Sequence, residues 1–313
     1  MRSLVSIISV MILFFCVPAC TTNKVAYRDP AKQGNKNHAI KKIVLIPGED
    51  SHGIGEHEHL GGCQLLAKLL NENVHGVEAI VTEQGWPKDT TVLDGADAIV
   101  MYSDGGERHM VIPHFEHMDR LMKKGVGLVN LHYAVEIPKG EGGGNYFLDW
   151  VGGYFEMDWS VNPFWVAKFE TFPKHPITNG VKPFEVRDEW YYHMRFREGM
   201  KNVTPILVAL PPASSLERPD GPHSNNADVR KAVLENKEPQ VMSWAYARPN
   251  GGRGFGLTGA HVHNNWMMDD FRKLVLNAIL WSAKTPVPKE GINTPTPTQD
   301  EMDAIRKHPD SKK

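Results

Sequence analysis

The sequence predicts an α/β protein built on a mainly parallel sheet. Short apolar runs alternate with amphipathic stretches over residues 42–132, as in strands joined by helical crossovers. The clearest case is the segment 112–132, where Phe115, Met118 and Leu121 recur at helical spacing before the run GVGLVNLH. Within this run, residues 126–131 are apolar enough to lie in a sheet that is buried on both faces, as parallel sheets are.

His132 stands at the carboxyl end of this expected central strand. Lys123, Lys124 and Gly125 end the preceding helix, because cations favour its last carbonyls and glycine adopts the left-handed conformation. In open α/β sheets, ligands collect beyond the carboxyl ends of the strands. His132 therefore lies where a functional residue is expected, and a structural histidine that closes the turn is the alternative.

The remaining elements follow from the same patterns. Helices are expected at 60–70, 112–124 and 270–281, and further strands at 42–47, 77–82, 98–102, 163–172, 184–192, 205–210, 241–247 and 254–258. Residues 42–284 are thus expected to form one large domain, followed by a Pro-rich polar tail at 285–313. The net charge is -2 and no long basic run occurs, so nucleic acid is not expected as a partner.

The N-terminus has the composition of a bacterial lipoprotein signal. Arg2 precedes an apolar stretch at 4–17 that is short for a membrane span, and the segment ends in Val-Pro-Ala-Cys. We expect residues 1–19 to be removed, Cys20 to be acylated, and 20–41 to form a flexible tether. Ordinary signal-peptidase cleavage is the alternative. Because threonine follows the cysteine, the expected location is the outer membrane, facing the periplasm or the cell surface.

Histidines and acids gather where strands or their loops should end. The first loop holds several of both types, and His261-x-His263 follows another expected strand, so that on extended backbone both rings would share one face. Imidazole with carboxylate suits a divalent transition metal or general acid/base catalysis, and the sequence leaves both open. Motifs for zinc proteases, nucleotide phosphates and serine hydrolases are missing.

A set of segments in order resembles the ThuA-like (trehalose utilisation) family. These segments are KIVLIPGEDSHG, GVGLVNLH, VGGYF, HPITNGVKPFEVRDEWYY and GGRGFGLTGAHVHNNWMMDDFRKLVLNAILW, which together span nearly all of residues 42–283. The resemblance implies a three-layer flavodoxin-like sandwich of the class I glutamine amidotransferase type. Those relatives carry a nucleophilic cysteine after the central strand. Here His132 replaces it, so glutamine hydrolysis is not expected.

The resemblance also implies site residues. His132, Glu189 and His261 match family positions and are the candidates for catalysis or for binding a divalent metal. The first loop departs from the family's wording, so either His52 or His57 could face the site. Further candidates for substrate contact are His52, Asp104, Tyr133, Trp159, Tyr191 and His263.

The expected function is carbohydrate catabolism. Family context suggests chemistry on 3-keto-glycosides by isomerisation, elimination or hydrolysis, with a saccharide as ligand. A separate sugar dehydrogenase would then supply the ketone, since the chain carries no redox cofactor motif. The aromatic-rich segment 146–165 could form a wall against a sugar. The alternative is a lipoprotein that binds a saccharide without catalysis.

Overall fold

The computed structural model describes residues 40–306. The expected signal peptide, Cys20 and nearly all of the tether lie outside the described residues, as does the end of the tail. Among the described residues, no helix combines the length and the apolar character that a membrane crossing requires.

A seven-stranded sheet forms the centre of the fold. Its strands are β1 (Lys41–Pro47), β2 (Val77–Val81), β3 (Ala98–Tyr102), β4 (Gly127–Leu131), β9 (Val203–Ala209), β10 (Gln240–Ala247) and β11 (Arg253–Leu257). The order is β2-β1-β3-β4-β11-β10-β9, and only β10 runs antiparallel to its neighbours. The expected mainly parallel sheet is confirmed, with β4 at its centre.

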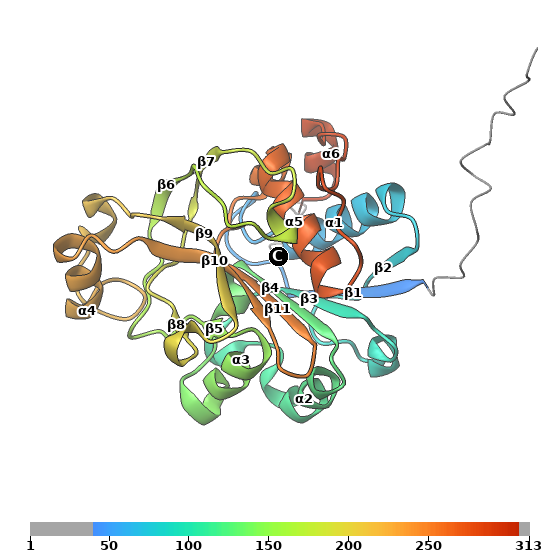
Figure 1. Cartoon of the computed structure of the whole chain (residues 1–313), viewed down its shortest axis with the longest axis horizontal. Coiled ribbons are helices and arrows are strands. Elements are labelled where there is room, and N and C mark those ends of the chain that lie inside the picture. Colours follow the sequence, from blue (N-terminus) through green and yellow to red (C-terminus); the bar gives the residue numbers. More distant parts are fainter. Residues whose placement is uncertain (1–39, 307–313) are drawn as a thin grey trace, which may run out of the picture. The chain divides into compact units, whose positions relative to one another are not determined.

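Helices cover both faces of this sheet, which gives three layers (Figure 1). On one face, Ile43 and Leu45 pack in the core with α1 (His59–Asn73) and α5 (Asp269–Ser282). On the other face, Val44 and Ile46 pack with α2 (Phe115–Lys123) and α3 (Gly144–Trp150). This division follows from the alternation of side chains along a strand, since the apolar run 43–46 of β1 must be covered on both sides.

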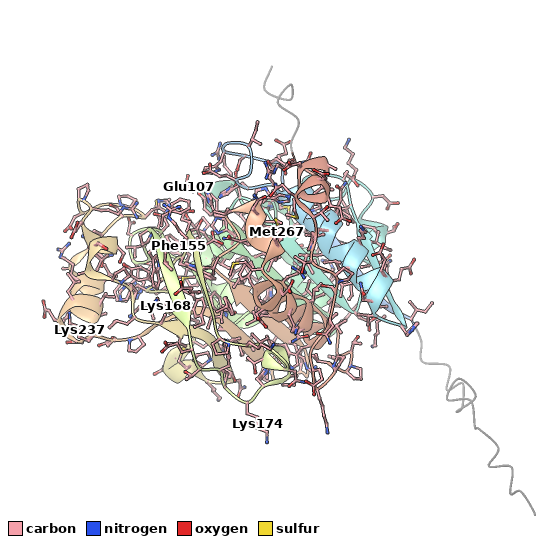
Figure 2. The ribbon with its side chains drawn as sticks, turned by 90° about the horizontal axis from the view of Figure 1, so that it is seen from above. Glu107, Phe155, Lys168, Lys174, Lys237 and Met267 are labelled. Carbon is pink, nitrogen blue, oxygen red and sulfur yellow. The ribbon has the colours of Figure 1, made fainter. Side chains whose placement is uncertain are left out.

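Shorter elements extend the domain beyond β4. The strands β6 (Phe164–Phe169) and β7 (Phe184–Glu189) form an antiparallel hairpin. A second small pair joins β5 (Gly153–Tyr154) to β8 (Arg195–Phe196), and α4 (Ala227–Arg230) continues into a π-helical turn. Figure 2 shows the side chains of this region, in which Phe155 is fully buried and Lys237 projects outward.

The described part of the C-terminal tail lies against the domain. It contains α6 (Gln299–Ala304), which begins with a capping box formed by Thr298 and Glu301. Ile292 and Met302 are buried in the core that also contains α1 and α5. Two well-placed apolar side chains therefore anchor a segment whose average composition is polar.

Candidate functional site

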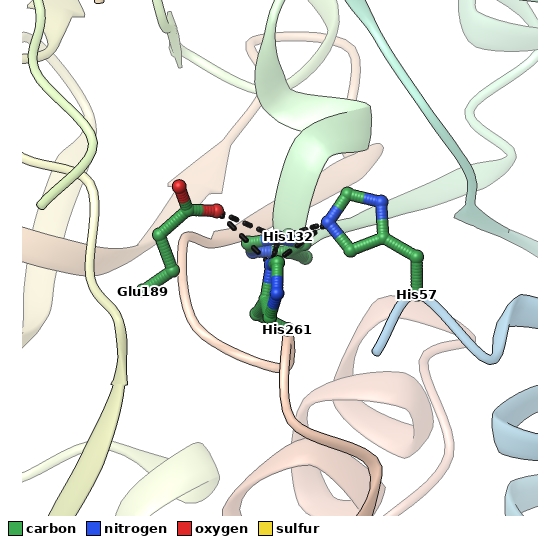
Figure 3. Close-up of side chains that lie close together, drawn as sticks. All are labelled: His57, His132, Glu189 and His261. Carbon is green, nitrogen blue, oxygen red and sulfur yellow. Dashed lines mark hydrogen bonds and ion pairs between the residues drawn. The ribbon is translucent and has the colours of Figure 1, made fainter. Parts of the chain in front are cut away.

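Four side chains from distant parts of the sequence converge at the carboxyl edge of the sheet (Figure 3). They are His57, His132, Glu189 and His261, and their ligand atoms all lie within 4.8 Å of one another. The three histidines are buried, and the Glu189 side chain is 13% exposed. The convergence of His132, Glu189 and His261, which the sequence could only suggest, is thus present in the structure.

His132 is placed by a sharp turn after β4. The residue has φ 55°, a left-handed conformation that costs energy for a side chain with a Cβ and is found where a site requires it. Its Nδ1 lies 2.8 Å from the carbonyl oxygen of Thr258, at the end of the neighbouring strand β11. Because a carbonyl only accepts, Nδ1 must carry the proton, which leaves Nε2 with a lone pair facing the centre.

His57 enters from the loop between β1 and α1, and of the two first-loop histidines it is the one that joins the four-residue cluster. Its Nδ1 lies 2.8 Å from Oδ1 of Asp104, in the loop after β3, and Ser51 donates to the same oxygen. The carboxylate therefore holds the proton on Nδ1, and Nε2 again faces the centre with a lone pair. Burial and the adjacent imidazoles lower the pKa of His57 far below its usual range.

His261 is held by the loop that follows β11. The buried carboxylate of Asp188 accepts the backbone N–H groups of Ala260 at 2.8 Å and His261 at 3.0 Å. Ala260 has φ 86°, so the loop turns sharply and directs His261 Nδ1 to the centre. Nε2 lies 3.8 Å from the Glu56 carboxylate, and although burial opposes it, the pairing with Glu189 raises the pKa of His261.

Glu189 closes the cluster from the end of β7. Its Oε2 lies 3.1 Å from Nδ1 of His261 and 3.5 Å from Nε2 of His132. The buried Tyr191 hydroxyl donates to the same oxygen at 3.2 Å and lies 3.2 Å from His132 Nε2. Burial opposes ionisation, but the contacts with the two histidines prevail and hold the pKa of Glu189 well below its usual range.

The donor geometry fits a single divalent metal ion. His57 Nε2 lies 3.0 Å from His132 Nε2 and 2.9 Å from His261 Nδ1, and the last two atoms are 3.2 Å apart. Nitrogens bound about 2.0–2.1 Å from a metal are themselves separated by about 2.9–3.4 Å in octahedral or tetrahedral geometry. With both Nδ1 atoms protonated, the Nε2 lone pairs of His57 and His132 face each other at 3.0 Å, an arrangement that a cation bound between them would stabilise.

The rim of the cluster carries several of the other predicted residues. His52 is exposed, and its ring centroid lies 3.8 Å from that of His57. Asp104 and Tyr191 contact cluster members as described, and the Tyr133 ring lies 6.0 Å from the His57 ring. Burial raises the pKa of the Tyr133 hydroxyl, which is therefore neutral.

Two of the residues predicted to contact substrate lie away from the cluster. His263 is fully buried and lies next to Gly61 of α1, because the backbone after Ala260 enters a 3-10 helix (His263–Met267) rather than extended structure. The expectation that His261 and His263 share one face is therefore wrong. Trp159 does not belong to the cluster either: it stacks on His193, and the Arg195 guanidinium lies over its ring at 3.6 Å.

The sequence interpretation did not single out Phe164 as a site residue. This side chain is 39% exposed, and its ring contacts His261 edge-on with centroids 4.8 Å apart. Phe164 lies in the aromatic-rich segment 146–165. Only the alternation of exposed and buried side chains along β6 distinguishes it from the buried Trp165. The alternation predicts that Phe164 and Trp165 lie on opposite faces of β6, but it does not predict which face lies next to the cluster.

The comparisons agree with this architecture. A ThuA-like protein from Bacteroides uniformis superposes with a TM-score of 0.55 at 15% identity, covering 82% of this chain and 95% of its own. A ThuA-like protein from Parabacteroides merdae gives 0.52 at 13% identity, with 84% and 99% covered. A glutamine amidotransferase from Thermotoga maritima matches with a TM-score of 0.41 at 11% identity, with 79% and 97% covered.

None of the curated proteins compared with the chain matches it. The family model described as trehalose utilisation, ThuA, matches residues 44–282. This range contains all four members of the cluster and the whole seven-stranded sheet except the first residues of β1. The two ThuA-like structures share the α/β architecture of this chain. The chain belongs to the ThuA family, whose members are associated with carbohydrate utilisation.

Proposed function

We propose that His57, His132, Glu189 and His261 bind one divalent metal ion and that this centre acts on a keto-sugar. The substrate class is a 3-keto-glycoside, and the reaction is enolisation followed by elimination of the glycosidic group or by isomerisation. The observation that carries the proposal is the convergence of two imidazole lone pairs, fixed by Thr258 and Asp104, on one carboxylate and a third imidazole.

The ligand set suits such a reaction. Three imidazoles and a carboxylate match Zn²⁺, Fe²⁺, Mn²⁺ or Ni²⁺, and they leave coordination positions free in a five- or six-coordinate site. A bound ion would supply Lewis acidity for a ketone and its neighbouring hydroxyl. The ketone at C3 acidifies the C–H bond at C2, so proton transfer rather than redox chemistry can cleave the molecule.

The rim offers contacts for a sugar ring. Phe164 is exposed and touches His261, which places an aromatic face beside the cluster. The apolar C–H face of a pyranose packs on such a ring. His52 lies on the exposed side of His57 and can contact hydroxyl groups. These residues support a saccharide as ligand.

The proposal implies a partner and a location. A separate sugar dehydrogenase would oxidise C3 of the glycoside before this protein acts on it. The N-terminal sequence supports acylation at Cys20, which would anchor the protein to the outer membrane facing the periplasm or the cell surface.

The test combines metal analysis with substrate turnover. Purified protein is stripped with a chelator, reloaded with each candidate metal, and assayed with methyl 3-keto-β-glucoside and with methyl β-glucoside. We expect one metal per chain and turnover of the keto-sugar alone. His132→Ala should lose metal and activity together, whereas the exposed His75→Ala serves as a matched control that keeps both.

The outcomes separate the alternatives. Inactivity towards both sugars under every metal condition contradicts the proposal. Saturable binding of the keto-sugar without turnover would instead make the chain a saccharide-binding protein. Turnover that is equal with and without metal would show that the cluster works by acid/base catalysis alone.

A further inference from the structure

A second polar pair, Glu136 and His223, lies beside the cluster. Glu136 is 2% exposed and follows the 3-10 turn that begins with His132. His223 comes from the loop between β9 and α4, and its side chain is 27% exposed. Its Nε2 lies 2.8 Å from Oε1 and 3.0 Å from Oε2 of Glu136. A buried carboxylate is costly unless it is paired, so the structure commits an imidazole to this position.

Two separate chains of contact join this pair to the cluster. On one side, a Cβ on Gly106 would lie 3.1 Å from Oε1 of Glu136 and 3.6 Å from the Tyr133 hydroxyl. The Glu136 carboxylate and the Tyr133 hydroxyl therefore both lie beside Gly106. On the other side, the His223 ring stacks on Phe155 with centroids 5.4 Å apart, and Phe155 packs on Tyr191 at 5.1 Å. Tyr133 and Tyr191 are the residues that border His57 and His132.

The orientation of His223 leaves one ring nitrogen available. A carboxylate only accepts, so Nε2 carries its proton towards Glu136. Nδ1 has no hydrogen-bond partner among residues 40–306. His223 also has φ 62°, one of several strained histidines that include His57 and His132. A carboxylate that orients an imidazole while the other nitrogen stays free is the arrangement of a general acid/base.

We propose that His223 is the proton-transfer residue of the site and that Glu136 is its positioning residue. This inference rests on the proposed function and names the group that moves the proton during elimination. The centre formed by His57, His132, Glu189 and His261 would hold the oxygen atoms of the keto-sugar, and His223 would work on the carbon and oxygen atoms at C2 and C1.

His223 both accepts the proton and returns it in this reaction. Neutral His223 takes the C2 proton at Nδ1, and the electron pair of that C–H bond forms the enolate of the C3 ketone. The enolate then forms the C1=C2 double bond as the C1–O bond breaks. The departing glycosidic oxygen takes the proton back from Nδ1. The products are the unsaturated keto-sugar and the alcohol, with His223 neutral again and no further reactant consumed.

His223→Gln in the metal-loaded enzyme tests the assignment. We expect kcat for methyl 3-keto-β-glucoside to fall by about 100- to 10,000-fold, the usual contribution of a general acid/base. Exchange of the C2 proton with deuterium from solvent, followed by NMR, should fall in parallel. The metal content should stay at the wild-type value.

A matched control is available in the same fold. His193 also has positive φ (59°) and stacks on an aromatic ring, but its Nδ1 donates to the Trp159 carbonyl, and no carboxylate among residues 40–306 is hydrogen-bonded to its ring. His193→Gln should therefore leave kcat and C2 exchange close to wild type. An equal loss in the His193 and His223 variants would overturn the assignment, as would loss of metal from His223→Gln.

Glu136→Gln separates positioning from simple support of the fold. The amide oxygen can still accept from Nε2, but the charge that raises the pKa of His223 is removed. The other charged groups that act on His223 are Glu189, which also raises its pKa, and Arg218, which lowers it. Since neutral His223 is the base, the acidic limb of the pH–kcat profile should move to lower pH. An unmoved limb contradicts the role of Glu136.

Failure of this inference is distinguishable from failure of the proposed function. If wild-type protein with metal does not convert the keto-sugar, the proposed function fails. If wild type converts it and His223→Gln does so equally well, the proposed function stands and only the assignment of the proton-transfer residue is wrong.

Discussion

Two kinds of buried histidine occur in this fold and differ in how their ring nitrogens are satisfied. His109 is 1% exposed, its Nε2 donates to the carbonyl of Ala134, and its Nδ1 accepts from the N–H of Val111. In the cluster, His132 and His57 also have one nitrogen held by an acceptor, but their other nitrogens face each other. A histidine with one proton and a partner at each nitrogen is structural, whereas two imidazole lone pairs that face each other form the arrangement in which a metal ion could bind.

The first prediction from this comparison is that a divalent metal stabilises the folded protein by binding to the cluster and at no other site. A metal present at about 1,000 times its Kd raises the free energy of unfolding by about 4 kcal/mol if it binds only the folded state. Denaturant unfolding with and without metal measures this increment. It should vanish in His132→Ala and persist in His109→Gln. An equal increment in both variants would place the metal elsewhere.

The second prediction concerns acid stability and His109. Burial lowers the pKa of His109 from 6.5 to about 4. Between these two values the imidazole is mostly protonated in the unfolded chain and mostly neutral in the folded protein. Stability is therefore full above about pH 6.5 and declines as the pH falls towards 4, by about 3 kcal/mol for this residue at about 1.4 kcal/mol per pKa unit.

Urea unfolding of metal-free protein across this pH range measures the slope. His109→Gln can keep both hydrogen bonds, because the amide both donates and accepts, yet it does not titrate. The variant should show a shallower decline than wild type. An identical slope would mean that other groups account for the acid sensitivity.

The third and smallest effect concerns Asp104, which orients His57. Asp104→Asn removes the charge that holds the Nδ1 proton and should weaken metal binding by about 10- to 100-fold, the usual effect of an outer partner of a metal ligand. Isothermal titration with the metal that the protein binds measures the affinity. Asp94→Asn, at an exposed position, serves as the control. Unchanged affinity would mean that Asp104 does not fix the tautomer of His57.

Part of the site could be predicted because it depends on strand ends. His132 ends an apolar run, and the carboxyl edge of a parallel sheet is where functional groups collect. The resemblance to the family added Glu189 and His261. Residues 52–59, in the loop before α1 and at its first position, include His52, His57 and His59. Local sequence cannot rank them, because contacts such as that of His57 with Asp104 join residues distant in the chain.

The error at His263 has a related cause. The prediction assumed that extended backbone continued through residues 261–263. Asp188, on another strand, instead accepts several backbone N–H groups of this loop and bends it, with Ala260 at positive φ. A side chain remote in sequence thus decided which of two neighbouring histidines enters the site.

The sequence by itself determined the α/β class, the central strand and the histidine at its end, because these depend on the local periodicity of apolar residues. Only the tertiary structure decided that His57 completes the cluster, that His263 is buried, and that Glu136 and His223 form a pair beside it. Each of those outcomes depends on contacts between segments distant in sequence, where burial and the match of donors to acceptors, rather than periodicity, determine the arrangement.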